Sequence, residues 1–150
     1  MYNRNIDMEM EGKIWKEGKF WLVDVPALDA MTQGKTRKKA LAMLEDLVLE
    51  MTKSYFEEEM GKDFFITVLD YKKDVVGVTA SDNRLFLALS LRRQREKSGF
   101  TVREASERLG SKSPNAYAQY ERGKTSISVD KYEELLLAAN PFEKLRLRIV

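Results

Sequence analysis

Three glycines divide the second half of this sequence and limit what it can fold into. Gly99, Gly110 and Gly123 each follow a run whose apolar residues recur at helical spacing, and glycine readily ends a helix in the left-handed conformation. One helix start is marked equally clearly, because Thr101 is a good N-cap and Glu104 three residues later completes a capping box. The second half is therefore predicted to consist of short helices joined by tight turns.

Four helices are expected in this half. They cover residues 83–97, 101–109, 113–122 and 129–140. Asp82 can cap the first of them and Ser113 the third, and Pro114 occupies the first helical position of the third, where its missing N–H costs little. The turn over residues 110–112 joins the second helix to the third, which is the layout of a helix-turn-helix.

The third helix carries two amide side chains on one face. Asn115 and Gln119 are four residues apart, and both can bond bidentately to adenine if the helix lies in the major groove. Side chains expected to contact the DNA backbone are Thr101, Arg103, Lys112, Ser113, Arg122 and Lys124. The alternative is a helical bundle that binds protein, with both amides exposed to solvent.

The same stretch resembles the helix-turn-helix of the XRE/Cro repressor family over residues 89–140. The matching parts are the Gly99-Phe100-Thr101 entry, the helix over residues 104–110 and the exit over residues 120–124. In that family the positions of Asn115 and Gln119 read bases, and the position of Glu121 is structural. The sequence departs from the family by one residue inserted in the turn and by Val102 in place of a common glutamine.

The first half predicts a small sheet with one packed helix. Strands are expected over residues 6–16, 19–25, 30–33 and 64–71, and a helix with a single apolar stripe over residues 35–60. The fold class is thus an α+β domain of order β-β-β-α-β over residues 1–74, a linker over 75–81 and an all-α domain over 82–150. Within the last domain, residues 142–150 alternate apolar and basic side chains, which is the pattern of a C-terminal strand. That strand would pair with a second copy or with the N-terminal sheet.

The N-terminal segment resembles the HicB antitoxin family. The resemblance rests on a hairpin ended by Pro26, a short strand leading into Gly34, and an amphipathic helix containing Ala40 and Leu44; Thr32 and Gln33 also stand at matching places. It implies a shortened RNase H-like domain that binds and blocks a HicA-like mRNA-cleaving toxin, while the C-terminal domain binds operator DNA and represses the operon. A homodimer or higher even oligomer is expected from the helix-turn-helix, because one short recognition helix covers too few base pairs and repressors of this class bind paired half-sites.

Composition excludes many enzyme classes. The 150 residues include no histidine and no cysteine, so there is no His-containing triad, no thiolate nucleophile and no His- or Cys-ligated zinc. We expect no enzyme activity and no cofactor. No apolar run has the length of a transmembrane helix or a signal peptide, so a cytoplasmic protein without membrane contact is expected.

Charge is divided between the two halves. Residues 1–80 contain 12 Lys and Arg against 15 Asp and Glu, a net charge of −3, whereas residues 81–150 contain 14 against 9, a net charge of +5. The basic half suits nucleic acid, and the acidic half suits a basic, RNA-binding partner or is an ordinary solvated surface.

Two rival functions remain open at this stage. One is a stand-alone repressor whose N-terminal domain dimerises or binds a small molecule. The other is a metal-dependent nuclease that uses Asp7, Asp24 and Asp70 around Mg²⁺.

Overall fold

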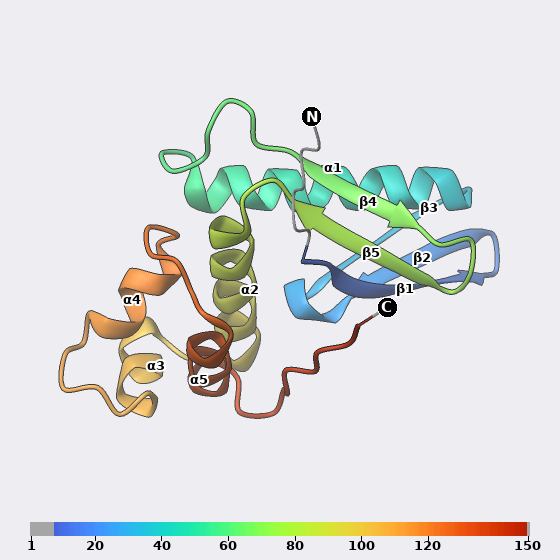
Figure 1. Ribbon diagram of the computed structural model, residues 1–150. Helices are drawn as coiled ribbons and strands as arrows, with labels where there is room; N and C mark the ends of the chain where they lie inside the picture. Colours follow the sequence, from blue (N-terminus) through green and yellow to red (C-terminus); the bar gives the residue numbers. More distant parts are fainter. Residues whose placement is uncertain (1–7, 150) are drawn as a thin grey trace.

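The N-terminal half forms one antiparallel sheet. A computed structural model describes residues 8–149; Ile6 and Asp7, the first two residues of the predicted strand over 6–16, and Val150 lie outside this range. The strands are β1 (Met10–Glu17), β2 (Phe20–Val25), β3 (Ala30–Gly34), β4 (Ile66–Asp70) and β5 (Val75–Ala80). They are arranged in the order β3-β2-β1-β5-β4, with each neighbouring pair antiparallel (Figure 1).

Helix α1 (Arg37–Phe56) covers one face of this sheet. Thr36 caps it by accepting a hydrogen bond from the Lys39 amide at 3.1 Å. Its buried side chains recur every four residues and face strand residues such as Val23 and Val78 in the core. The helix is shorter at both ends than the predicted 35–60, because Thr36 caps it at one end and a turn follows Phe56 at the other.

The predicted linker contains a strand, so this part of the sequence prediction is wrong. Residues Val75–Ala80 form β5, which lies between β1 and β4, and five of its six residues are buried. The sheet module therefore has the order β-β-β-α-β-β. A strand buried on both faces shows no alternation of polar and apolar residues, so a run of six residues had no period that distinguished it from a loop.

Helix α2 (Asn83–Ser98) belongs to two hydrophobic cores. Leu85, Phe86 and Leu89 pack in the core of the sheet module, whereas Leu91 packs with the three helices that follow. Those helices are α3 (Val102–Arg108), α4 (Ala116–Glu121) and α5 (Val129–Ala139). The first residues predicted for the C-terminal domain thus pack against the N-terminal sheet.

Buried polar side chains of α2 fix it to the short 3-10 helix η1 (Pro26–Leu28). Ser90 Oγ donates to the Ala27 carbonyl at 2.6 Å, and Gln94 Nε2 donates to the Pro26 carbonyl at 2.7 Å. Arg93 donates to the carbonyls of Leu28 and Asp29. The same α2 side chains also contact α5, since Gln94 Oε1 accepts from Asn140 Nδ2 at 2.9 Å.

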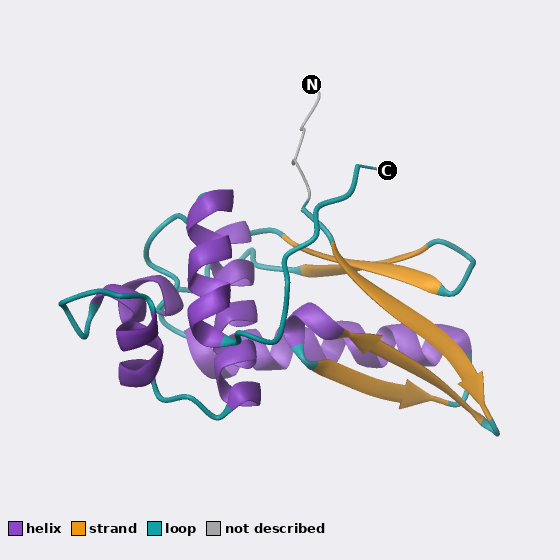
Figure 2. Cartoon of the chain, turned by 90° about the horizontal axis from the view of Figure 1, so that it is seen from below, coloured by secondary structure: helices purple, strands orange, loops and turns teal. Residues whose placement is uncertain are grey.

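The tail after α5 contains no strand among its described residues, 141–149, so the predicted C-terminal strand is not found in the single chain. A strand is defined by hydrogen bonds to a neighbouring strand, and the tail lies beside neither edge strand, β3 or β4, in a way that forms them. The tail instead runs back toward the start of β1, where Arg148 contacts Glu11 (Figure 2). No helix within residues 8–149 is long and apolar enough to span a membrane.

Replacing Gln94 by alanine should destabilise the fold strongly. The change removes three hydrogen bonds, and it leaves the buried side-chain amide of Asn140 without its partner on α2 while the Pro26 and Ala27 carbonyls lose the Gln94 donor. We expect a loss of about 1–3 kcal/mol in the free energy of unfolding, measured by urea denaturation. The matched control is Gln33→Ala on the exposed edge strand β3, which should change it by less than about 0.5 kcal/mol. An equal effect of the two changes would show that the contact between α2 and η1 contributes little.

Candidate nucleic-acid interface

Helix α4 is held against α2 by a buried ion pair. Arg95 donates two hydrogen bonds to Glu121 Oε1, at 3.1 and 2.7 Å, and one to Oε2 at 2.9 Å, and the two side chains are only 12% and 7% exposed. Arg95 also donates to the Phe100 carbonyl at 2.9 Å, so one guanidinium connects α2, the entry to α3 and the end of α4. The hydrogen bonds to Glu121 raise the pKa of Arg95 further above its ordinary value.

This ion pair buries the Glu121 carboxylate, as the structural role implied by the family resemblance requires. The sequence did not identify its partner, because Arg95 lies 26 residues earlier and no local spacing relates the two. Only the packing of α4 across α2 brings them together.

The contact between α3 and α4 completes the helix pair. Ser106 Oγ on α3 donates to the Ser113 carbonyl in the turn at 2.9 Å, and Tyr117 is fully buried. Burial, together with the nearby Glu121 carboxylate, raises the pKa of the Tyr117 phenol well above its ordinary value. The inward side of α4 is therefore fixed, and its other side is left to solvent.

The recognition helix begins later than the sequence predicted. The structure has α4 starting at Ala116, with Asn115 as its N-cap and with Ser113 and Pro114 in the turn before it. Ser113 Oγ accepts a hydrogen bond from the backbone N–H of Asn115 at 3.3 Å, and Ser111 Oγ accepts one from the backbone N–H of Ser113 at 3.2 Å. Such serine hydrogen bonds compete with those of a helix. Ser113 and Pro114 therefore belong to the turn, which is one residue longer than usual, and do not form the first residues of the helix.

The two predicted base-reading residues still lie on one face. The backbone N–H of Gln119 donates to the backbone carbonyl of Asn115 at 3.2 Å. The two residues therefore lie one helical turn apart, and both are exposed. The Asn115 side chain makes no capping hydrogen bond. Neither amide group is thus used to hold the domain together.

The predicted phosphate contacts are also exposed. Thr101 caps α3 and its capping box with Glu104 is present as predicted; its oxygen accepts a hydrogen bond from an amide, which leaves the hydroxyl hydrogen free to donate. Arg103 is paired with Glu107 at 3.4 Å. The ion pairs found within residues 8–149 include none with the exposed side chains of Lys112, Arg122 or Lys124.

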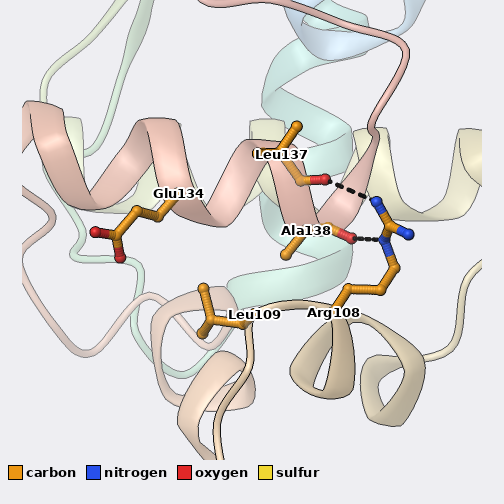
Figure 3. A pocket seen from close by; sticks show the side chains of 5 residues that line it. All are labelled: Arg108, Leu109, Glu134, Leu137 and Ala138. Atoms are coloured by element: carbon orange, nitrogen blue, oxygen red, sulfur yellow. Dashed lines mark hydrogen bonds between the residues drawn. The ribbon is translucent and has the colours of Figure 1, made fainter.

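A shallow hollow of about 380 Å³ between α3 and α5 does not have the chemistry of a reaction site (Figure 3). Its two charged side chains have partners: Arg108 donates to the carbonyls of Ala138 and Leu137, and Glu134 pairs with Lys131 at 3.2 Å. Arg108 therefore pairs with the carbonyls at the C-terminal end of α5.

The described residues do not assemble the proposed magnesium site. Asp70 lies opposite Val76 and Val76 opposite Gly12, whereas Asp24 lies opposite Lys13, the next residue along β1. Since successive residues of a strand point to opposite faces, the two carboxylates lie on opposite faces of the sheet. Asp70 is instead paired with Arg37 at 2.8 Å, whose hydrogen bonds hold the Asp70 pKa below its ordinary value. Asp7 lies outside the described residues.

Comparison with known proteins identifies the same helices. Residues 91–140 match the family model described as Helix-turn-helix (HTH_3), which belongs to the XRE type. The match begins at Leu91 in α2 and ends after α5, close to the predicted range of 89–140, and it supports DNA-binding transcriptional regulation. No curated protein matches the chain. The resemblance of the sheet module to HicB antitoxins stays a prediction.

Replacing Gln119 by alanine should relax sequence preference. Its exposed amide then no longer bonds a base edge, and we expect about 1–3 kcal/mol of discrimination to be lost at one base pair of the operator. Selection of bound sequences from a random DNA pool, for the parent and the variant, measures this change. An unchanged preferred operator would remove Gln119 from the set of base-reading residues.

Replacing Lys124 by alanine should weaken binding to all sequences alike. The loss of one phosphate contact lowers the slope of log Kobs against log[salt] by about one. The control is Lys19→Ala in the exposed turn between β1 and β2, at the end of the sheet away from α4 in Figure 1, and its slope should equal that of the parent. A Lys124 variant with the parent slope would place this side chain off the phosphates.

Proposed function

We propose that this chain, whose residues 91–140 are an XRE-type helix-turn-helix domain, is the antitoxin of a type II toxin–antitoxin pair. It binds operator DNA to repress its own operon, and it binds a small, HicA-like, mRNA-cleaving toxin. The observation that carries the DNA half is the exposed face of Asn115 and Gln119 on a helix whose opposite side is fixed by the Arg95–Glu121 pair.

Operator binding requires two copies. The helix α4 has only six residues, so one copy reads few base pairs. Repressors of this type bind two half-sites spaced by about one helical turn of DNA. An even oligomer of the chain supplies the second recognition helix.

The toxin half of the proposal is supported by the sheet module, which the proposed DNA contacts do not involve. The sheet and α1 have a hydrophobic core of their own, and none of the predicted DNA-contacting residues lies in them. This half carries a net charge of −3. A protein that cleaves mRNA must hold a polyanion and is therefore basic on its binding surface, so an acidic module is complementary to it.

Co-expression with the small open reading frame next to its gene tests the toxin half. The expected result is a stable complex in a pull-down on this chain and recovery of growth from the toxicity of the partner. Absence of both partner and toxicity would leave a stand-alone repressor, in which the sheet module dimerises or binds a small molecule.

A variant with both Gln119→Ala and Lys124→Ala separates the two activities. Both side chains are exposed and lie outside the sheet module. We therefore expect loss of operon repression in a reporter assay with full recovery of growth. Loss of growth recovery in this variant would mean that the toxin contacts the helix-turn-helix itself.

A further inference from the structure

Three turns of the sheet module meet at one end of the sheet, the end away from α4 in Figure 1. They are the β1–β2 turn, the segment between β3 and α1, and the β4–β5 turn, and Figure 2 shows the same end from a second side. Arg37 joins them, since its guanidinium donates to Asp70 Oδ1 at 2.8 Å and lies 5.7 Å from the ring centre of Trp21. Trp21 in turn lies opposite Lys16 on β1 and Gly34 on β3. Contacts within the chain therefore hold the three turns side by side.

This end of the module, which we call the basic end, is formed by residues 16–19, 35–39 and 70–74. These segments contain eight Lys and Arg against three Asp and Glu, a net charge of +5, although residues 1–80 together carry −3. Arg37 is paired with Asp70, and Lys72 also lies 4.0 Å from that carboxylate. The other six cations are exposed lysines that take part in none of the ion pairs found within residues 8–149: Lys16, Lys19, Lys35, Lys38, Lys39 and Lys73. Such a cluster of ammonium groups is complementary to a polyanion.

Two aromatic side chains are exposed beside these lysines. Trp15 and Phe20 are 36% and 39% exposed. Trp15 points away from α1 because it alternates with the buried Ile14, and Phe20 shares that face because it lies opposite Glu17, two residues along β1 from Trp15. Ile14 N donates to the Asp74 carbonyl at 2.9 Å, so Trp15 also lies beside the β4–β5 turn with its lysines.

The exposed rings indicate which polyanion fits. A DNA duplex keeps its bases stacked inside the helix, so it would contact the lysines and leave both rings in water. A single strand has bases that stack on aromatic side chains while its backbone follows the cations. More than a third of Trp15 and of Phe20 is exposed and the rest is packed. Each therefore offers a ring face to a base, and neither protrudes as a group that inserts into lipid does.

We propose that the basic end of the sheet module binds single-stranded RNA, with its lysines along the phosphates and with Trp15 and Phe20 stacked on bases. The choice of RNA over single-stranded DNA rests on the proposed function, since the toxin acts on mRNA. RNA on the basic end leaves the acidic part of the module free for a basic toxin. Exposed or half-buried carboxylates lie along α1 after its first two turns and in the turn that follows it: Glu45, Asp46, Glu50, Glu57, Glu58 and Glu59.

Fluorescence anisotropy of a labelled oligouridine of about 12 nucleotides, titrated with the full chain, tests the proposal. The parent should bind it, and Lys16→Glu combined with Lys73→Glu should weaken binding about tenfold at low salt, because two phosphate contacts become repulsive. The matched control is Lys53→Glu combined with Lys62→Glu, two exposed lysines of the same half that lie outside the basic end. It makes the same change in net charge and should bind nearly as well as the parent. No binding by the parent, or equal weakening by the two pairs, would overturn the site.

Stacking is tested separately from charge. Trp15→Ala should weaken RNA binding about tenfold without changing the slope of log Kobs against log[salt], because a stacked base is lost and no cation is. Trp15→Phe should retain most of the affinity. The matched control is Met31→Ala, 54% exposed and on the same face, since it lies opposite Asp24 on β2. Circular dichroism of each variant checks that the fold is intact. A Trp15→Ala variant that binds like the parent would overturn the stacking and with it the single-stranded ligand.

Further measurements locate the RNA and identify its class. The variant with both Gln119→Ala and Lys124→Ala should bind the oligouridine like the parent, and weaker binding would place the RNA on the helix-turn-helix and overturn the proposal. Tighter binding of a single-stranded DNA of matching length and base composition would overturn the choice of RNA. Sedimentation of the parent with phosphatidylserine vesicles, without binding of RNA, would assign the basic end to a membrane surface instead. None of these measurements uses toxin or operator, so their failure would leave the antitoxin role to the co-expression test.

Discussion

The hydrogen bonds between helix α2 and the η1 turn are the interaction on which the arrangement of this protein depends. Consecutive carbonyls from Pro26 to Asp29 accept from Ser90, Arg93 and Gln94. Without these donors, the carbonyls of Ala27, Leu28 and Asp29 would lose their hydrogen-bond partners on α2, and each polar group left unpaired away from water costs about 1–3 kcal/mol, which is a large fraction of the stability of a small domain. Because the polar side chains of α2 are used in this way, the helix has one position against the sheet.

The position of α2 against the sheet also fixes the position of the helix-turn-helix, because α2 is bonded to α4 and to α5. Gln94 also accepts from Asn140, and the Ser90 hydroxyl lies 2.6 Å from that of Tyr132 on α5. Next to Gln94 along α2, Arg95 holds α4 through Glu121. The sheet module and the recognition helix are therefore both attached to one helix, and there is no flexible linker between them in the described chain. The sheet module is therefore held at a defined place relative to the helix-turn-helix.

Most of the candidate interface could be predicted from the sequence, because its signals are local. The Thr101–Glu104 capping box, the glycines that follow α2, α3 and α4, and the four-residue spacing of Asn115 and Gln119 act within one or two turns of chain, and the structure has all three features. The late start of α4 was missed because serine turns over residues 111–115 compete with the helix, and sequence gives no measure of which wins. For Asp24 and Asp70 the missing information is tertiary. The sequence predicts that both lie on strands, but only the register of the sheet shows that they point to different faces.

The elements whose cause is local follow from the sequence: the existence of the helices, the capping box of α3, the glycine stops after α2, α3 and α4, the first hairpin, and the chemistry of the exposed face of α4. Tertiary structure decided the rest. It made Val75–Ala80 a central strand, gave Glu121 its partner 26 residues away, and left residues 141–149 without a strand because no edge of the same chain pairs with them. The physical reason is common to these cases, since a strand or a buried ion pair is completed by groups distant in sequence, and only the folded chain brings those groups within hydrogen-bonding distance.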